Sequence, residues 1–157
     1  MVHDPERDGE RLVFVLRATN IVETKMKRVI SAFVAAPSER REFVESYLLS
    51  NATTPFAAKV KLVLFIAKSL LVKVDHEAMH TLLSRRNAFA HQDHLESIRI
   101  VKDSAGRPDV AFVVESIKSS GELEAVSQAQ AFAEFAAAYA TAEADLDTLL
   151  AKLGPSA

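Results

Sequence analysis

Apolar residues recur at intervals of three and four along most of this chain, which is the spacing of amphipathic α-helices. A first long helix is predicted to begin at Pro5, among acidic residues, and to end before Pro37. Its buried stripe is expected to consist of Leu12, Val15, Leu16, Thr19, Val22, Met26, Val29, Ile30 and Phe33. This pattern predicts a helix that lies along a substantial core.

Three more helices are predicted after the first. Ser38 is suited to cap a second helix over 38–50, and the sequence NATTP (51–55) ends it. The apolar face of a third helix is predicted to contain Phe56, Val60, Val63, Leu64, Ala67, Leu70 and Leu71. Asp75 is predicted to cap a fourth helix, which carries the segment SRRNAFAHQD (84–93).

The hydrophobic period then changes from that of a helix to that of a strand. Residues 96–102 alternate, 104–108 are typical of a turn, and 109–117 are rich in β-branched residues, so a β-hairpin is predicted over about 96–117. A last helix is predicted from about Glu122 to Leu153, with an alanine-rich surface that would let a neighbouring helix approach closely. Together these elements predict an all-α bundle of about five helices, with a small β-hairpin before the last helix, as one domain over 1–157.

Composition narrows the class of protein. The chain has 157 residues, of which 49% are hydrophobic and 25% charged, as in ordinary globular domains. Its net charge of −2 indicates no general attraction to nucleic acid, and the absence of cysteine excludes thiol chemistry. The charged start and the short apolar run at 62–67, flanked by Lys61 and Lys68, predict a cytoplasmic protein without a membrane segment.

The sequence HEAMH (76–80) fits the pattern His-Glu-x-x-His. Two histidines one helical turn apart can hold zinc with the glutamate as general base, so a zinc metallopeptidase through His76, Glu77 and His80 is one alternative. Catalytic zinc needs a third ligand, and Arg86 stands where one large class of zinc peptidases has histidine. The remaining conceivable ligands, at no familiar spacing, are His91, His94 and Glu96. We therefore expect no bound metal and no cofactor.

Arg86 falls where the fourth helix otherwise places apolar side chains. At ~100° per residue, one arc of roughly 120° contains Met79, Leu82, Leu83, Phe89 and Ala90, with Arg86 near its middle. Burying an unpaired charge is costly. Two interpretations therefore stay open: a structural salt bridge to a carboxylate such as Glu23 or Glu45, or a cleft in which guanidinium and imidazole converge on an anion.

The segment from Arg86 to His91 resembles the signature of the HEPN superfamily of small α-helical proteins. The family pattern is Arg, four to six residues, then His, often with Asn, Asp or His directly after the Arg; Arg86, Asn87 and His91 match it. The preceding TPFAAKVKLVLFIAKSLL is similar to the branch that includes mannitol-operon-repressor-like proteins, in which Phe-x-x-Lys-[Ile/Val] leads into Ile-Arg-Asn-x-x-Ala-His. The residues that match this longer pattern are Phe56, Lys59, Val60 and Ala90, whereas Arg85 stands where an aliphatic residue is usual.

The resemblance implies a HEPN-like domain over about residues 10–150 and a metal-independent endoribonuclease of toxin or defence type. It equally fits a non-catalytic transcriptional regulator or interaction module with the same fold, and it suggests an antitoxin or regulatory protein as a partner. Some toxins of the superfamily carry a tyrosine two residues after the histidine, which a partner nucleotidyltransferase modifies; here that position is Asp93, so this mode of neutralisation is not expected.

The chemistry of the three motif residues suits RNA. His91 could transfer protons near neutral pH, Arg86 could hold a phosphate, and Asn87 could orient the imidazole or bind RNA. A local basic groove could be formed by Lys59, Lys61, Arg85, Arg86 and Arg99. Because this motif typically lies between subunits in the family, and because the last helix is rich in alanine, a homodimer is also expected.

Overall fold

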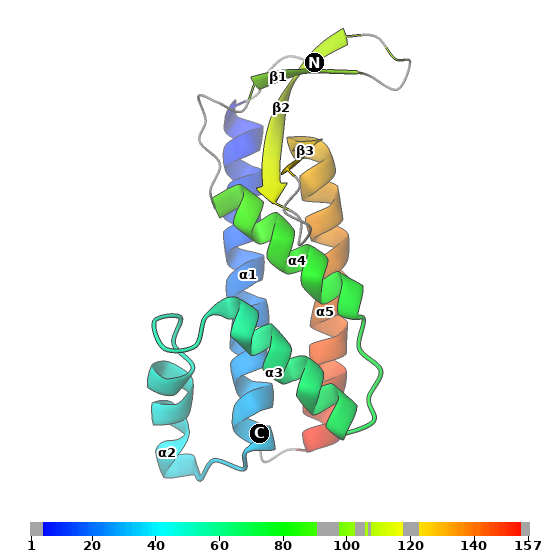
Figure 1. Cartoon of the computed structure of the whole chain (residues 1–157). Coiled ribbons are helices and arrows are strands. Elements are labelled where there is room, and N and C mark those ends of the chain that lie inside the picture. The colour runs from blue at the N-terminus through cyan, green and yellow to red at the C-terminus, as the bar shows by residue number, and fades with distance from the viewer. Residues whose placement is uncertain (1–4, 91–97, 103–105, 107, 118–122, 155–157) are drawn as a thin grey trace.

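The chain folds into a helical bundle with a small sheet at one end (Figure 1). The structure, a computed structural model, describes residues 5–90, 98–102, 106, 108–117 and 123–154. In these ranges the helices are α1 (Pro5–Phe33), α2 (Ser38–Glu42), α3 (Phe56–Ser69), α4 (His76–Ala90) and α5 (Gln128–Leu153). The strands are β1 (Ile98–Lys102), β2 (Pro108–Ile117) and β3 (Leu123–Ser127). The prediction of a mostly helical chain with about five helices is confirmed.

The two longest helices, α1 and α5, lie side by side and run in the same direction (Figure 1). Near the start of both, the ring of Phe14 meets that of Phe132 edge-on, with centroids 5.5 Å apart. Further along both, the Lys25 ammonium reaches the carboxylates of Glu143 at 2.9 Å and Asp147 at 2.7 Å. These contacts fix the register of the pair, on which the rest of the fold is built.

Helices α3 and α4 form a hairpin that crosses α1 and α5 (Figure 1). The largest fully buried apolar side chains come from all four helices: Val15, Val22, Met26, Val29, Val60, Val63, Met79, Leu82, Phe135, Leu146 and Leu149. The prediction for the buried stripe of α1 is wrong at Leu16 and Phe33, which are 52% and 36% exposed. Leu16 lies ~100° round the helix from Val15, outside the arc that α5 and α3 cover.

The second predicted helix is interrupted. It begins at Ser38, which is the first helical residue and not a side-chain cap, and after Glu42 it continues as a π-helix over Phe43–Leu48. The N–H of Leu49 donates to the carbonyl of Val44 at 2.8 Å, a bond across five residues that is typical of a π-turn. This short arm lies beside the end of α1 (Figure 1).

The strands form an antiparallel sheet in the order β1-β2-β3. Ile98 pairs with Phe112 in the predicted hairpin, and Val113 begins a second ladder by pairing with Ser127. The prediction that the last helix begins near Glu122 is wrong, because residues 123–127 pair with the far half of β2. Ser127 then caps α5, its hydroxyl accepting the N–H of Gln130 at 3.2 Å.

No helix in the described ranges is long and apolar enough to cross a membrane.

Candidate functional site

The site residues predicted from the sequence lie on α4, whose position is fixed at both ends. At its start the Asp75 carboxylate accepts the N–H of Ala78 at 2.9 Å, so the predicted cap is confirmed. Asp75 is itself tied to α5, because its own N–H donates to the Asp145 carboxylate at 2.7 Å. The helix then carries Arg86 and Asn87 toward the first residue of α3.

The Arg86 side chain is half-buried and has two described contacts. Its Nη1 donates to the Asn87 side-chain carbonyl at 3.0 Å, and the guanidinium carbon lies over the Phe56 ring, 5.9 Å from the centroid. Phe56 is buried and begins α3. Two elements of the family pattern, Phe56 and Arg86-Asn87, are therefore in contact.

Arg86 has no carboxylate partner in the part of the chain that the structure describes. Glu23, one carboxylate considered for a structural salt bridge, accepts hydrogen bonds from Lys59 and Asn51 instead, and Glu45 forms no ion pair with Arg86. The structure thus shows no salt bridge from Arg86 to either of these two carboxylates, and the other interpretation, a cleft that takes an anion, stays a prediction. A half-buried guanidinium that is stacked on a ring but not neutralised can accept an anion from outside.

The third motif residue, His91, lies outside the described residues. The same holds for His94 and Glu96, considered as third zinc ligands, and for Asp93. Arg86 and Asn87 are thus the two motif residues that the structure brings together.

Arg85 does not contribute to a basic groove. Its side chain is buried, and its Nε donates to the carboxylate of Glu134 on α5. Glu134 also accepts the side-chain amide of Gln130 at 2.9 Å. The buried arc of α4 thus includes Arg85 and leaves Arg86 at its edge, because α5 provides the larger share of the surface on which α4 packs.

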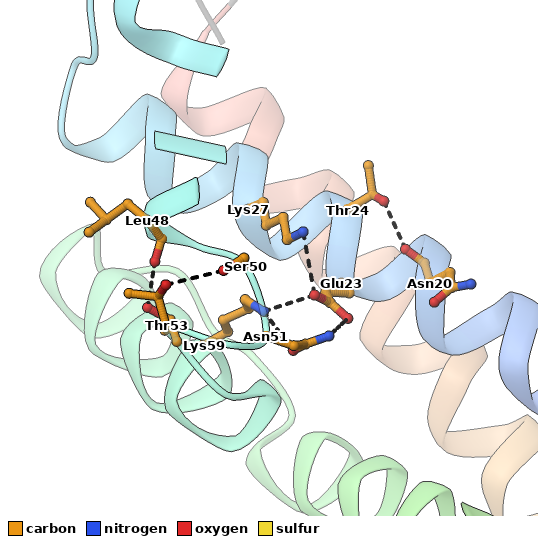
Figure 2. A network of polar contacts seen from close by, with 10 residues as sticks. Asn20, Glu23, Thr24, Lys27, Leu48, Ser50, Asn51, Thr53 and Lys59 are labelled. Atoms are coloured by element: carbon orange, nitrogen blue, oxygen red, sulfur yellow. Dashed lines mark hydrogen bonds and ion pairs between the residues drawn. The ribbon is translucent and has the colours of Figure 1, made fainter. Parts of the chain in front are cut away.

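Lys59 is the second cation whose predicted position was wrong. Its side chain is 0% exposed, and its ammonium donates to Glu23 at 2.8 Å and to the side-chain carbonyl of Asn51 at 2.9 Å. Asn51 closes the triangle by donating to the second Glu23 oxygen at 3.0 Å (Figure 2). The network joins α1, α3 and the loop that returns from the arm. Lys59 is therefore not part of a solvent-exposed basic groove.

Burial alone would raise the pKa of Glu23, but hydrogen bonds from Lys59 and Asn51, and the charges of Lys59 and Lys27, outweigh it and lower the pKa below its ordinary value. A sequence signal for this pair existed. Lys59 follows Phe56 by three residues and precedes Val63 by four, which places it on the apolar face of α3. The family pattern contains this lysine, and here its contacts are structural.

The two histidines of HEAMH are exposed and lie one turn apart, with ring centroids separated by 4.5 Å. Among the described residues no group of three histidine, aspartate or glutamate side chains is arranged to hold a metal. The conceivable third ligands all lie outside those residues. The structure therefore describes only the two histidines of the zinc alternative, His76 and His80.

No protein-family model, no curated protein and no solved structure matches this chain. The function is therefore inferred from the chain's own side chains, beginning with Arg86 and its contacts with Phe56 and Asn87.

Proposed function

We propose that this chain is a HEPN-like protein that binds RNA, and cleaves it without a metal ion, through Arg86, Asn87 and His91. The observation that carries the proposal is the guanidinium of Arg86, which is half-buried, held over Phe56 and by Asn87, and not neutralised by any carboxylate among the described residues. The planar guanidinium of such an arginine can donate two parallel hydrogen bonds to two oxygens of a phosphate.

The reaction that fits these residues uses the RNA as its own nucleophile. The 2′-hydroxyl attacks the adjacent phosphorus, giving a 2′,3′-cyclic phosphate and releasing the 5′-oxygen of the next nucleotide. His91 takes the proton from the 2′-hydroxyl or returns one to the leaving 5′-oxygen, while Arg86 stabilises the charge that develops on the phosphoryl oxygens. Asn87 accepts a bond from Arg86 and so helps to orient it.

We propose further that the protein is a homodimer whose two motifs share a cleft. The buried alanines of α5, Ala131, Ala138 and Ala142, pack inside the chain and leave the other face free for such contact. Four alanines at helical spacing remain exposed on α5: Ala133, Ala137, Ala140 and Ala144. Small side chains allow two helices to approach closely. A toxin or defence role, with an antitoxin partner, is the biological setting that this activity suggests.

The test is RNA cleavage by purified protein in the presence of a chelator. Wild type is compared with Arg86→Ala, Asn87→Ala and His91→Ala, each first shown to be folded by circular dichroism. His80→Ala is the matched control, because His80 is an exposed histidine on the same helix. We expect Arg86→Ala and His91→Ala each to reduce cleavage at least about a hundredfold, the range for loss of a proton-transfer or charge-stabilising group, and His80→Ala to leave it unchanged.

Binding is measured in parallel with a labelled RNA. If wild type binds RNA, loses affinity on Arg86→Ala and never cleaves, the protein is a non-catalytic regulator that uses the same site. If cleavage survives both substitutions, or depends on His76 and His80 with added zinc, the proposal is wrong.

A further inference from the structure

A second surface lies at the turn between α3 and α4, at the opposite end of α4 from Arg86 (Figure 1). Three large apolar side chains of α3 and this turn are exposed: Leu62, in the middle of α3, by 41%, Phe65 by 63% and Leu71, in the turn, by 93%. Lys68 and Lys73, both exposed, lie among them in the sequence. We call these five residues the hairpin surface.

The hairpin surface is hollowed beside Phe65. An open hollow of about 470 Å³ is lined by the apolar side chains of Leu64, Val72 and Val74, together with Phe65, Lys68 and Lys73. Since the lysines stand at an apolar concavity, the hollow is suited to an apolar side chain that is flanked by negative charge.

The charged side chains of α3 and the turn that follows it are all basic. Residues 55–74 contain no aspartate or glutamate and four lysines, of which Lys59 is buried against Glu23 and the other three are exposed. Two carboxylates at the start of α4, those of Asp75 and Asp145, accept the backbone N–H groups of Ala78 and Asp75. Both carboxylates keep their charge, but neither lines the hollow, whereas Lys68 and Lys73 do, so the charge at the hollow itself is positive.

Leu71 combines an exposed side chain with a left-handed backbone conformation. The N–H groups of Leu71 and Val72 donate to the carbonyls of Lys68 and Ala67 at 3.2 and 2.9 Å, closing α3 as a Schellman motif. Leu71 stands at the position of that motif with φ of 56°, where glycine is usual. The chain thus holds a leucine in a left-handed conformation and exposes 93% of it to solvent.

We propose that the hairpin surface is a docking site for an acidic amphipathic segment of a partner protein. One apolar side chain of that segment enters the hollow beside Phe65, and its carboxylates meet Lys68 and Lys73. A concave apolar site with charge at its margin fits an inserted side chain, whereas a flat anionic bilayer would leave the hollow unfilled. The surface is separate from Arg86, so the proposal stands or fails independently of RNA cleavage.

The test uses the full chain and a labelled peptide of about twelve residues, with Phe and Leu at helical spacing and Glu elsewhere, beside a twin peptide with Lys in place of Glu. We expect the acidic peptide to bind and the basic twin not to. Lys68→Glu with Lys73→Glu, and separately Phe65→Ala, should each weaken binding at least about tenfold. The controls lie on the arm: Arg40→Glu for exposed charge and Tyr47→Ala for exposed aromatic area.

Any one of four outcomes would overturn the proposal. The two peptides bind equally, or the arm variants lose as much affinity as the hairpin-surface variants. Wild type binds phosphatidylglycerol vesicles through Phe65 but not the acidic peptide, which would make the surface a membrane contact. Phe65→Ala converts a dimer to a monomer in light scattering without peptide, which would make it a contact between two copies of this chain.

Discussion

The guanidinium of Arg86 lies over the ring of Phe56, 5.9 Å from its centroid. This contact joins the first residue of α3 to the last turn of α4 and keeps the cation half-buried without neutralising its charge. The neighbouring Arg85 is neutralised by Glu134. Two adjacent arginines therefore have opposite surroundings, and their substitution should have opposite consequences.

Arg86→Ala should lower stability only slightly. The contact with Phe56 is a cation–π interaction of a kind that contributes about 0.5–1 kcal/mol, or about 1–4 °C in melting temperature for a chain of this size. Arg85→Ala should lower the melting temperature by more, because it leaves Glu134 without its partner at a partly buried position. Thermal unfolding followed by circular dichroism measures both. A larger loss for Arg86→Ala than for Arg85→Ala would indicate a structural role for Arg86.

The Lys59–Glu23 pair should be one of the most sensitive positions in the fold. Lys59→Met removes a cation that is 0% exposed and leaves the Glu23 carboxylate buried, a loss of about 3–5 kcal/mol, on the order of 10 °C. The double variant Glu23→Leu with Lys59→Met should recover most of that loss, because no buried charge remains. Chemical denaturation of the two single variants and the double variant measures the coupling; additive losses would contradict it.

The same pair predicts a dependence on pH. The pKa of Glu23 in the folded chain lies below its ordinary value of 4.5, because hydrogen bonds and charges from its partners outweigh its burial. Its ionised form therefore stabilises the fold above 4.5, and this stabilisation is lost as the pH falls through the folded pKa. Glu23→Gln should thus be less stable than wild type at neutral pH, and the difference should shrink as unfolding is repeated at pH values below 4.5. A difference that stays constant with pH would show that the charge of Glu23 contributes nothing.

The helices of this fold could be predicted because burial repeats along a helix with a fixed period, and because Pro5, Pro55 and Asp75 mark helix starts by local chemistry. Strand β3 could not be, since Leu123–Ser127 is ordered by pairing with the far half of β2, and no local pattern encodes that partner. The π-helix over Phe43–Leu48 was not predicted either, since such turns are rare within α-helices and the three-and-four spacing of apolar residues does not reveal them.

For the candidate site, the surroundings of the charged residues were the part that could not be predicted from the sequence. Arg86 was singled out because the predicted apolar arc of α4 had it near its middle, whereas in the structure the buried arc includes Arg85 and leaves Arg86 at its edge. The sequence could not show that Arg85 is the more buried of the two, since a turn of ~100° about the helix axis decides which one meets α5. Lys59 was expected in solvent because a cation is usually exposed. Only the three-dimensional positions of Glu23 and Asn51 show which groups pair with it.

The exposed alanines of α5 give a prediction for assembly. If Ala137 and Ala140 lie in a contact between two copies, then Ala137→Glu and Ala140→Glu should each convert a dimer to a monomer, because a large charged side chain prevents close approach of the helices. Ala52→Glu, at an exposed alanine of the loop after the arm, should leave the dimer intact. Light scattering at micromolar concentration is the measurement, and a monomeric wild type would contradict the shared cleft.

The last prediction separates stability from binding at the hairpin surface. Leu71 and Ala35 both close a helix in the left-handed region, with φ of 56° and 51°. Glycine adopts this conformation without the Cβ clash, so Leu71→Gly and Ala35→Gly should each raise unfolding free energy by about 0.5–1 kcal/mol, or roughly 1–4 °C in melting temperature.

Only Leu71→Gly removes an exposed side chain from the hairpin surface. It alone should therefore lower the affinity for the acidic peptide while raising the free energy of unfolding. Ala35→Gly is the matched control for the backbone effect. If both variants gain stability and bind the peptide as wild type does, Leu71 takes no part in docking. If Leu71→Gly lowers the melting temperature, its side chain supports the fold, and the strain at this position has a structural cause.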